Sequence, residues 1–227
     1  MQQFAVIVAG GSGTRMGGGL PKQFRPLCGR PVLWWSMKAF KDENPETEII
    51  LVLPHDFISL WKEIIDSLPE EERFRHLIAE GGKIRSDSVK NGLDLINNNE
   101  SLVAIHDGAR PLVNKKIISD GWINAKNNGA AIPVIPVTDS LRKVEKDKKS
   151  HSVDRNGFVA VQTPQVFKTS LLKGAFNLTE DNSFTDEASL VESVGNEVVM
   201  FEGSNENLKI TNPKDLEIAT VLMGGNV

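Results

Sequence analysis

The chain has 227 residues, of which 40% are hydrophobic and 25% charged, and its formal net charge at pH 7 is −4. The apolar fraction is large enough for a hydrophobic core, so the composition excludes a disordered protein. The net negative charge argues against non-specific binding to nucleic acid or to a membrane surface, because both depend on an excess of basic residues.

Several features of the sequence indicate a cytoplasmic protein of one domain. No apolar run approaches the roughly 18 residues of a membrane span, and no charged segment precedes the first apolar run in the manner of a signal peptide. Cys28 is the only cysteine, which excludes an intrachain disulfide and fits a reducing compartment; we expect it to be a small buried hydrophobic residue. The length fits a single α/β domain over residues 1–227.

Short β-branched runs alternate with helix-length segments through the first half of the chain. The expected strands are Phe4–Ala9, Ile49–Leu53, 77–79 and Leu102–Ile105, and the expected helices lie around Val32–Lys41, Ile58–Leu68 and Ser88–Ile96. Strands separated by helices pair in parallel through right-handed crossovers. The pattern therefore predicts a doubly wound, mostly parallel α/β sheet, with ligands bound beyond the carboxyl ends of the strands.

The pattern changes after residue 130. Two extended runs, Ile132–Val137 and Val153–Val161, flank the charged segment Arg142–Lys149. This predicts a protruding two-stranded arm over residues 137–161, and the alternative is a disordered charged loop. Because proteins usually cover the exposed edges of such an arm, we expect a second copy of the chain to pair with it in a homodimer.

The last part of the chain is expected to be mostly helical. Helices are predicted near Ser170–Asn177, from Asp186 to Val194 and from Pro213 onward, with a strand at Val198–Phe201 between them. A short extended run, Asn207–Thr211, precedes the closing helix.

A glycine-rich segment follows the first predicted strand. Six glycines lie between Gly10 and Gly19, and Arg15 and Lys22 are close by. The segment is not a dinucleotide-binding fingerprint, since Met16 stands where that pattern needs glycine, and it lacks the Gly-Lys-Ser/Thr of a P-loop. Backbone N–H groups in a glycine bend can approach phosphate oxygens, and the two cations can neutralise their charge. A loop that only turned the chain would not need both cations.

Polar residues also follow later strands. Asp107 ends a strand beside Arg110, which leaves two interpretations open: a ligand for Mg²⁺, or an ion pair that fixes the loop. His106 is expected to pack rather than to bind a metal. Around Gly81 and Gly82, Arg85 favours a loop that shapes a nucleotide pocket, and either Ser86 or Asp87 is the expected helix N-cap. Lys209 alone would be interpreted as a solvated lysine.

Six segments together resemble one enzyme family. They are AGGSGTRMGGGLPKQF, GGKIRSDSV, HDGARP, SVDRNGFVAVQTPQVF, TDEASLVE and NLKITNPKDL. In this order and spacing they resemble the 2-C-methyl-D-erythritol 4-phosphate cytidylyltransferases of the non-mevalonate isoprenoid pathway. The resemblance implies a Rossmann-like nucleotidyltransferase that uses CTP, a polyol phosphate acceptor and a divalent cation, Mg²⁺ or another, and releases pyrophosphate.

The resemblance also implies a role for each matching residue. The catalytic cations would be Arg15, Lys22 and Lys209. The nucleotide would be bound by Ala9, Gly10, Gly11, Gly13, Gly82 and Ser88. The acceptor would be bound by Asp107, Arg110, Ser140, Arg155 and Thr185, with Asp107 also holding the metal. Ser140 and Arg155 lie on the predicted arm and would reach the neighbouring subunit's site. The attacking phosphate is already anionic at neutral pH, so no general base is needed.

Two positions depart from the family pattern. Ala9-Gly10-Gly11 stands where most methylerythritol enzymes have Ala-Ala-Gly, and Lys83 stands where some members have an acidic residue. The Ala-Gly-Gly form also occurs in the related ribitol 5-phosphate cytidylyltransferases, which are therefore the alternative. The segments around Asp107, Arg155 and Thr185 favour the methylerythritol group. A non-catalytic nucleotide-binding module would lack the cations at the reacting phosphate, which are present here.

Overall fold

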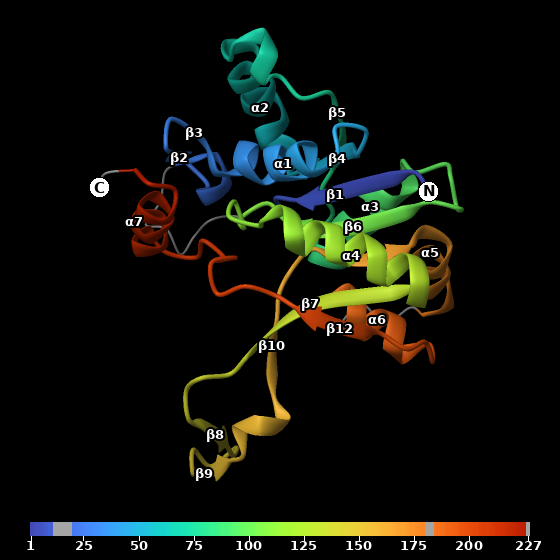
Figure 1. Cartoon of the computed structure of the whole chain (residues 1–227), viewed down its shortest axis with the longest axis vertical. Helices are drawn as coiled ribbons and strands as arrows, with labels where there is room; N and C mark the ends of the chain where they lie inside the picture. The colour runs from blue at the N-terminus through green and yellow to red at the C-terminus, as the bar shows by residue number, and fades with distance from the viewer. Residues whose placement is uncertain (11–19, 180–183, 226–227) are drawn as a thin grey trace.

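The computed structural model describes residues 1–10, 20–179 and 184–225, and an eight-stranded sheet forms its centre (Figure 1). The strands are β1 (Gln3–Val8), β4 (Glu48–Leu53), β5 (His76–Glu80), β6 (Leu102–Asp107), β7 (Ala130–Pro136), β10 (Val159–Val161), β11 (Gln165–Lys168) and β12 (Val199–Glu202). Their order is β10-β7-β11-β6-β1-β4-β5, with β12 also paired to β7.

The four strands predicted for the first half form a continuous parallel run, β5-β4-β1-β6, and β12 also pairs in parallel with β7. β1 lies between β4 and β6, with Val6 opposite Ile50 on one side and Ile105 on the other, and β5 follows β4 in parallel. β11 runs antiparallel to both β6 and β7. The mostly parallel sheet is confirmed, although β11 was not among the predicted strands.

Helices cover both faces of the sheet (Figure 1). The helices are α1 (Val32–Glu43), α2 (His55–Ser67), α3 (Arg85–Asp94), α4 (Lys115–Asn128), α5 (Thr169–Leu178), α6 (Glu187–Ser193) and α7 (Pro213–Leu222). Ala5 and Ile7 of β1 pack with residues of α1, α2 and α4, whereas Phe4 and Val6 pack with α3, α5 and α6. Successive side chains of a strand point to opposite faces, so this division is the expected one for a doubly wound sheet.

A glycine sets how closely α3 approaches the sheet. A Cβ atom at Gly92 would lie 2.6 Å from Cγ1 of Val6 and 3.0 Å from Cγ2 of Val52. Only glycine allows the helix to lie at this depth. The first turn of α3 is thereby held beside the carboxyl ends of β1 and β4.

A two-stranded hairpin, β8 (Leu141–Val144) and β9 (Ser150–Val153), projects away from the sheet (Figure 1). It lies within the predicted arm, but residues 159–161 form β10 and pair with β7 in the main sheet. Val144 and Phe158 are exposed large apolar residues of this region. The role of the arm in dimerisation stays a prediction.

The prediction for Cys28 was wrong. The residue is exposed, because it and Gly29 form the two-residue turn between β2 (Pro26–Leu27) and β3 (Arg30–Pro31). Both turn residues have positive φ, 45° and 80°, as a type I′ turn requires. The sulfur thus lies at a hairpin tip rather than in the core.

Within the described residues, no helix is both long enough and apolar enough to cross a lipid bilayer.

Candidate active site

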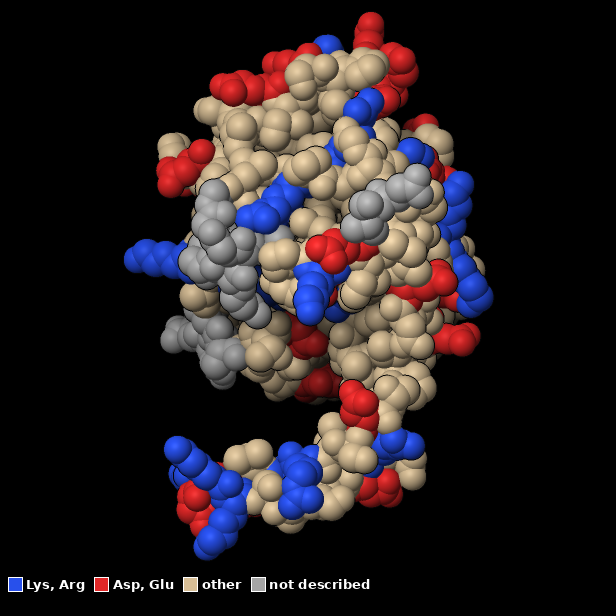
Figure 2. Space-filling view, turned by 90° about the vertical axis from the view of Figure 1, so that its left-hand side faces the viewer, with Lys and Arg blue, Asp and Glu red and all other residues tan. Residues whose placement is uncertain are grey.

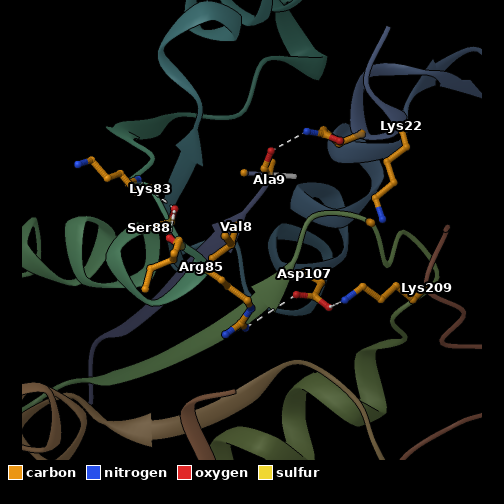
Figure 3. A pocket seen from close by; sticks show the side chains of 13 residues that line it. Val8, Ala9, Lys22, Lys83, Arg85, Ser88, Asp107 and Lys209 are labelled. Carbon is orange, nitrogen blue, oxygen red and sulfur yellow. Dashed lines mark hydrogen bonds and ion pairs between the residues drawn. The ribbon is translucent and has the colours of Figure 1, made fainter. Parts of the chain in front are cut away.

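A cavity of about 330 Å³ lies beyond the carboxyl ends of β1, β5 and β6 (Figure 3). Its walls come from segments that follow these three strands, together with Lys22 and Lys209. Parallel strands present their carboxyl ends at one edge, so residues far apart in the chain meet here. The cavity contains predicted nucleotide-binding and catalytic residues side by side.

The first wall follows β1. Ala9 is buried, and its carbonyl oxygen accepts a 2.6 Å hydrogen bond from Nε2 of the buried Gln23. This bond ties the exit of β1 to the short 3₁₀ helix η2 (Lys22–Phe24), which begins with Lys22. Gly10 also lines the cavity. Three predicted residues of this loop, Gly11, Gly13 and Arg15, lie outside the described residues.

The second wall is the loop between β5 and α3. The hydroxyl of Ser88 accepts from the N–H of Gly82 at 3.0 Å and donates to the carbonyl oxygen of Ile84 at 3.1 Å. The predicted N-cap was wrong: α3 begins at Arg85, Ile84 occupies the N-cap position, and the carboxylate of Asp87 accepts from the N–H of Ile84. Gly82 and Ser88 are therefore held together at the cavity.

Asp107 is the carboxylate at the end of β6, and three cations surround it. Its Oδ2 lies 2.7 Å from Nζ of Lys209 and 3.8 Å from Nε of Arg110, and its Oδ1 lies 3.9 Å from Nη2 of Arg85. Burial alone would raise the pKa of Asp107, but the cations, Lys209 foremost, outweigh it and the pKa is lowered. Asp107 is therefore ionised at neutral pH.

Arg85 makes a second ion pair that the sequence analysis missed. Its Nη1 and Nη2 donate to the two carboxylate oxygens of Glu187 at 2.6 Å and 2.9 Å. Burial raises the pKa of Glu187, and the nearby guanidinium only partly offsets this effect. The pair joins the first residue of α3 to the first residue of α6.

Lys209 lies on an irregular segment that neighbouring residues hold in place. Asn207 is fully buried, and its Nδ2 donates to the carbonyl oxygen of Thr163 at 2.9 Å and to Oε1 of Gln162 at 3.3 Å. Its own carbonyl oxygen accepts from Nη1 of Arg110 at 2.7 Å. An extended run was predicted here from the sequence, but no signal in the sequence marks Asn207 as the residue that anchors it.

A second cavity of about 210 Å³ adjoins the first. Its lining includes Arg110 and Thr185, both predicted to bind the acceptor. Arg85, Asp107 and Lys209 line both cavities. These three charged residues therefore stand at the junction, where ligands in the two cavities would meet.

The side chains around the junction carry an excess of positive charge. Among the described residues that line the two cavities, five are Lys or Arg and two are Asp. Figure 2 shows Lys and Arg side chains near the centre of this face, with acidic side chains beside them. In Figure 3 the side chain of Lys22 points toward Asp107 and Lys209, whereas that of Lys83 points away from them. A concentration of cations in a chain of net charge −4 suits a polyphosphate ligand.

His106 is a packing residue, as predicted. Its ring is buried against Phe40, Nδ1 contacts the hydroxyl of Thr163, and Nε2 lies 3.1 Å from the carbonyl oxygen of Arg110. Burial lowers the pKa of His106 to about 4, so the ring is neutral at pH 7. It supports the walls of the site and does not face the cavity as a base.

The side chains at the junction offer few ligands for Mg²⁺. Within the described part of the chain there is no group of three or more His, Cys, Asp or Glu side chains that could hold a metal ion. Asp107 offers one ionised carboxylate at the shared wall. This fits an ion bound by one carboxylate, water and substrate phosphates, which is a common way for proteins to hold Mg²⁺.

Two predicted acceptor-binding residues lie elsewhere. Ser140 and Arg155 belong to the arm and are exposed, and Arg155 donates to the carbonyl oxygen of Thr138. Neither residue is part of the lining of the two cavities. Within one copy of the chain, the structure does not bring them together with Asp107 and Lys209.

Comparison with known proteins identifies the family. The family model IspD, 2-C-methyl-D-erythritol 4-phosphate cytidylyltransferase, matches residues 3–225. The chain is 45% identical over 225 residues to the enzyme of that name from Bacteroides fragilis and 44% identical over 223 residues to that from Phocaeicola vulgatus. Each alignment covers 98% of this chain and 100% of the relative.

Comparison with solved structures indicates the same family. The chain is similar to the crystal structure of 2-C-methyl-D-erythritol 4-phosphate cytidylyltransferase from Thermus thermophilus, with a TM-score of 0.76, 32% identity and 98% coverage of both chains. It also resembles the 4-diphosphocytidyl-2C-methyl-D-erythritol synthase of Anaerococcus prevotii, with a TM-score of 0.82, 25% identity and coverage of 98% of this chain and 96% of the other. The chain therefore belongs to the 2-C-methyl-D-erythritol 4-phosphate cytidylyltransferase family.

Proposed function

We propose that this protein transfers the cytidylyl group of CTP to 2-C-methyl-D-erythritol 4-phosphate and releases pyrophosphate. The observation that carries the proposal is the pair of adjoining cavities that share Arg85, Asp107 and Lys209. Two substrates can bind on either side of this junction, and the bond between their phosphates forms there. Membership of the family supplies the identity of the two substrates.

In this arrangement the nucleotide occupies the cavity beside Gly10, Gly82 and Ser88, and the acceptor occupies the cavity beside Arg110 and Thr185. Lys22 and Lys209 approach the junction from different segments and neutralise the charge that accumulates as one phosphate attacks another. Arg15 would add a further cation from the glycine loop.

The chain's own residues align the two substrates and neutralise the charge of their phosphates. No side chain has to accept a proton. The attacking phosphate is anionic at neutral pH, and the neutral His106 is turned into the protein interior. Holding two phosphates in line reduces the entropic barrier of their reaction. Asp107 would hold Mg²⁺, which supplies positive charge to the phosphate oxygens.

We also propose that the enzyme works as a homodimer in the cytoplasm. Ser140 and Arg155 do not line the cavities of their own chain and are exposed in the region of a projecting arm, so a role in the reaction would place them at the site of a second copy. The exposed apolar residues of the arm region, Val144 and Phe158 among them, favour contact with that copy. A single cysteine fits the reducing cytoplasm.

The acceptor is tested by measuring pyrophosphate release from CTP and Mg²⁺ with 2-C-methyl-D-erythritol 4-phosphate and with ribitol 5-phosphate in separate reactions. The first acceptor should give turnover, and the second should give at most a small fraction of it. Turnover with ribitol 5-phosphate alone would contradict the proposed acceptor but not cytidylyl transfer. Failure with both would contradict the activity itself.

A further inference from the structure

Arg85 is exposed to both cavities, and a buried partner fixes its direction. It lines the nucleotide and acceptor cavities alike, and its side chain is 32% exposed. The side chain of Glu187 is 2% exposed and is not part of the lining of either cavity. One end of the pair therefore faces the site, and the other end lies in the protein interior.

The contact between the two side chains is bidentate. The two terminal nitrogens of Arg85 donate to the two oxygens of Glu187 at 2.6 Å and 2.9 Å. Such a fork fixes the plane of the guanidinium as well as its position, which a lysine could not reproduce. Because α3 and α6 each begin at one member of the pair, the contact also fixes the distance between these two helix ends.

A contribution to the stability of the fold would not by itself explain why a buried ion pair stands here. Taking two charges out of water is costly, and apolar side chains of similar size are often at least as stabilising. The pair does, however, keep a cation directed at the junction of the two cavities. The geometry therefore favours a role in the site over a purely structural one.

The charges alternate from the interior to the junction. Glu187 pairs with Arg85. Arg85 lies 3.9 Å from Asp107, and Asp107 lies 2.7 Å from Lys209 (Figure 3). Without the charge of Glu187, Asp107 would become the strongest partner of Arg85. Arg85 would then move toward Asp107 and compete with Lys209 for it.

We propose that Arg85 is a further phosphate-binding residue at the junction of the two cavities and that Glu187 is its positioning residue. This inference rests on the proposed function, since it requires that two phosphates meet at the junction. The ligand of Arg85 is an anionic phosphate oxygen of the reacting pair, and Glu187 acts on the reaction only through Arg85.

The test is a double-mutant cycle on the full-length protein, measured by pyrophosphate release with CTP and the acceptor varied in turn. We expect Arg85→Gln to lower kcat/KM for the acceptor by about 10²-fold and Glu187→Gln to lower it by about 10-fold or more. In the Arg85→Gln background, Glu187→Gln should have no further effect, since the residue through which it acts is absent. Arg85→Lys should recover only part of the loss, because it restores the charge without the fork.

The matched control is Glu192→Gln, an exposed glutamate on the same helix, which should behave as the unchanged protein. Thermal unfolding of every variant separates a change in kinetics from a loss of fold. If Glu187→Gln does not fold, the variant with both Arg85→Met and Glu187→Met removes both charges while retaining the buried volume. It should fold and show the same kinetic loss as Arg85→Gln.

The outcomes separate this inference from the proposed function. If the unchanged protein is inactive with CTP and both polyol phosphates, the proposed function fails. If it is active but Glu187→Gln lies within threefold of it, or if the two losses multiply in the double variant, the positioning role of Glu187 is wrong. If Arg85→Gln retains full kcat/KM, Arg85 does not bind a reacting phosphate.

Discussion

Replacing Asn207 by alanine should weaken both the fold and the reaction. The change removes the Nδ2 group that donates to the carbonyl oxygen of Thr163 at 2.9 Å and to Oε1 of Gln162 at 3.3 Å. Asn207 is fully buried, and the change leaves the buried Thr163 oxygen without this donor. Gln162 is affected less, because its Oε1 also accepts from the N–H of Ser204 at 3.2 Å.

The expected magnitude follows from these contacts. A buried acceptor left without a donor costs about 1–3 kcal/mol, and losing one of two donors costs about 1 kcal/mol, for a total of about 2–4 kcal/mol. Because Lys209 lies two residues farther along the same segment, we also expect kcat to fall by about 10-fold through its displacement. The KM for CTP should change less, since Gly82 and Ser88 are held by their own hydrogen bond.

Urea unfolding followed by tryptophan fluorescence measures the first effect, and pyrophosphate release measures the second. Asn205→Ala is the matched control, because Asn205 lies in the same turn but is exposed. A loss of less than about 0.5 kcal/mol in Asn207→Ala, the range of ordinary surface changes, would refute the assigned hydrogen bonds. A normal kcat despite lower stability would show that Asn207 does not position Lys209.

Three further predictions concern single side chains. Lys22→Ala should lower kcat by about 10²-fold with an unchanged unfolding midpoint, since it removes one stabilising charge; a near-normal rate in the pyrophosphate assay would remove Lys22 from catalysis. Arg155→Ala should raise the KM for the acceptor with little change for CTP, and mixing it with Lys22→Ala protein should restore some activity if sites are shared between subunits; no recovery would count against sharing. Because burial lowers the pKa of His106 to about 4, the unfolded chain binds its proton first as pH falls. Stability should therefore decrease between about pH 6.5 and pH 4, by up to about 3 kcal/mol. His106→Asn should flatten this decrease in urea unfolding at pH 7 and pH 5, and an unchanged pH dependence would contradict the buried neutral ring.

The parallel strands could be predicted from the sequence because each one is a local apolar run followed by a helix-length segment. β11 could not, since Gln165–Lys168 is short, follows Pro164 directly and shows no alternation. Its identity as a strand depends on its neighbours β6 and β7, to which it pairs. Such pairing is a tertiary effect that a local pattern does not contain.

The residues of the candidate site that lie in the six segments resembling the enzyme family could be predicted from the sequence. Asp107, Lys209, Gly82 and Ser88 do line the first cavity together. The partner of Arg85 was not predictable, because Glu187 lies 102 residues away in the chain. An isolated glutamate at a helix start looks like a surface residue until the contact between the first residues of α6 and α3 is known.

Because Cys28 lies at a hairpin tip, its thiol is a site for attaching a covalent label. The chain has one thiol, and it is exposed. A maleimide dye or nitroxide spin label would therefore attach once per chain, without removal of other cysteines. In a dimer the two nitroxides would lie at one fixed separation, so dipolar electron resonance could measure the assembly of subunits directly in solution.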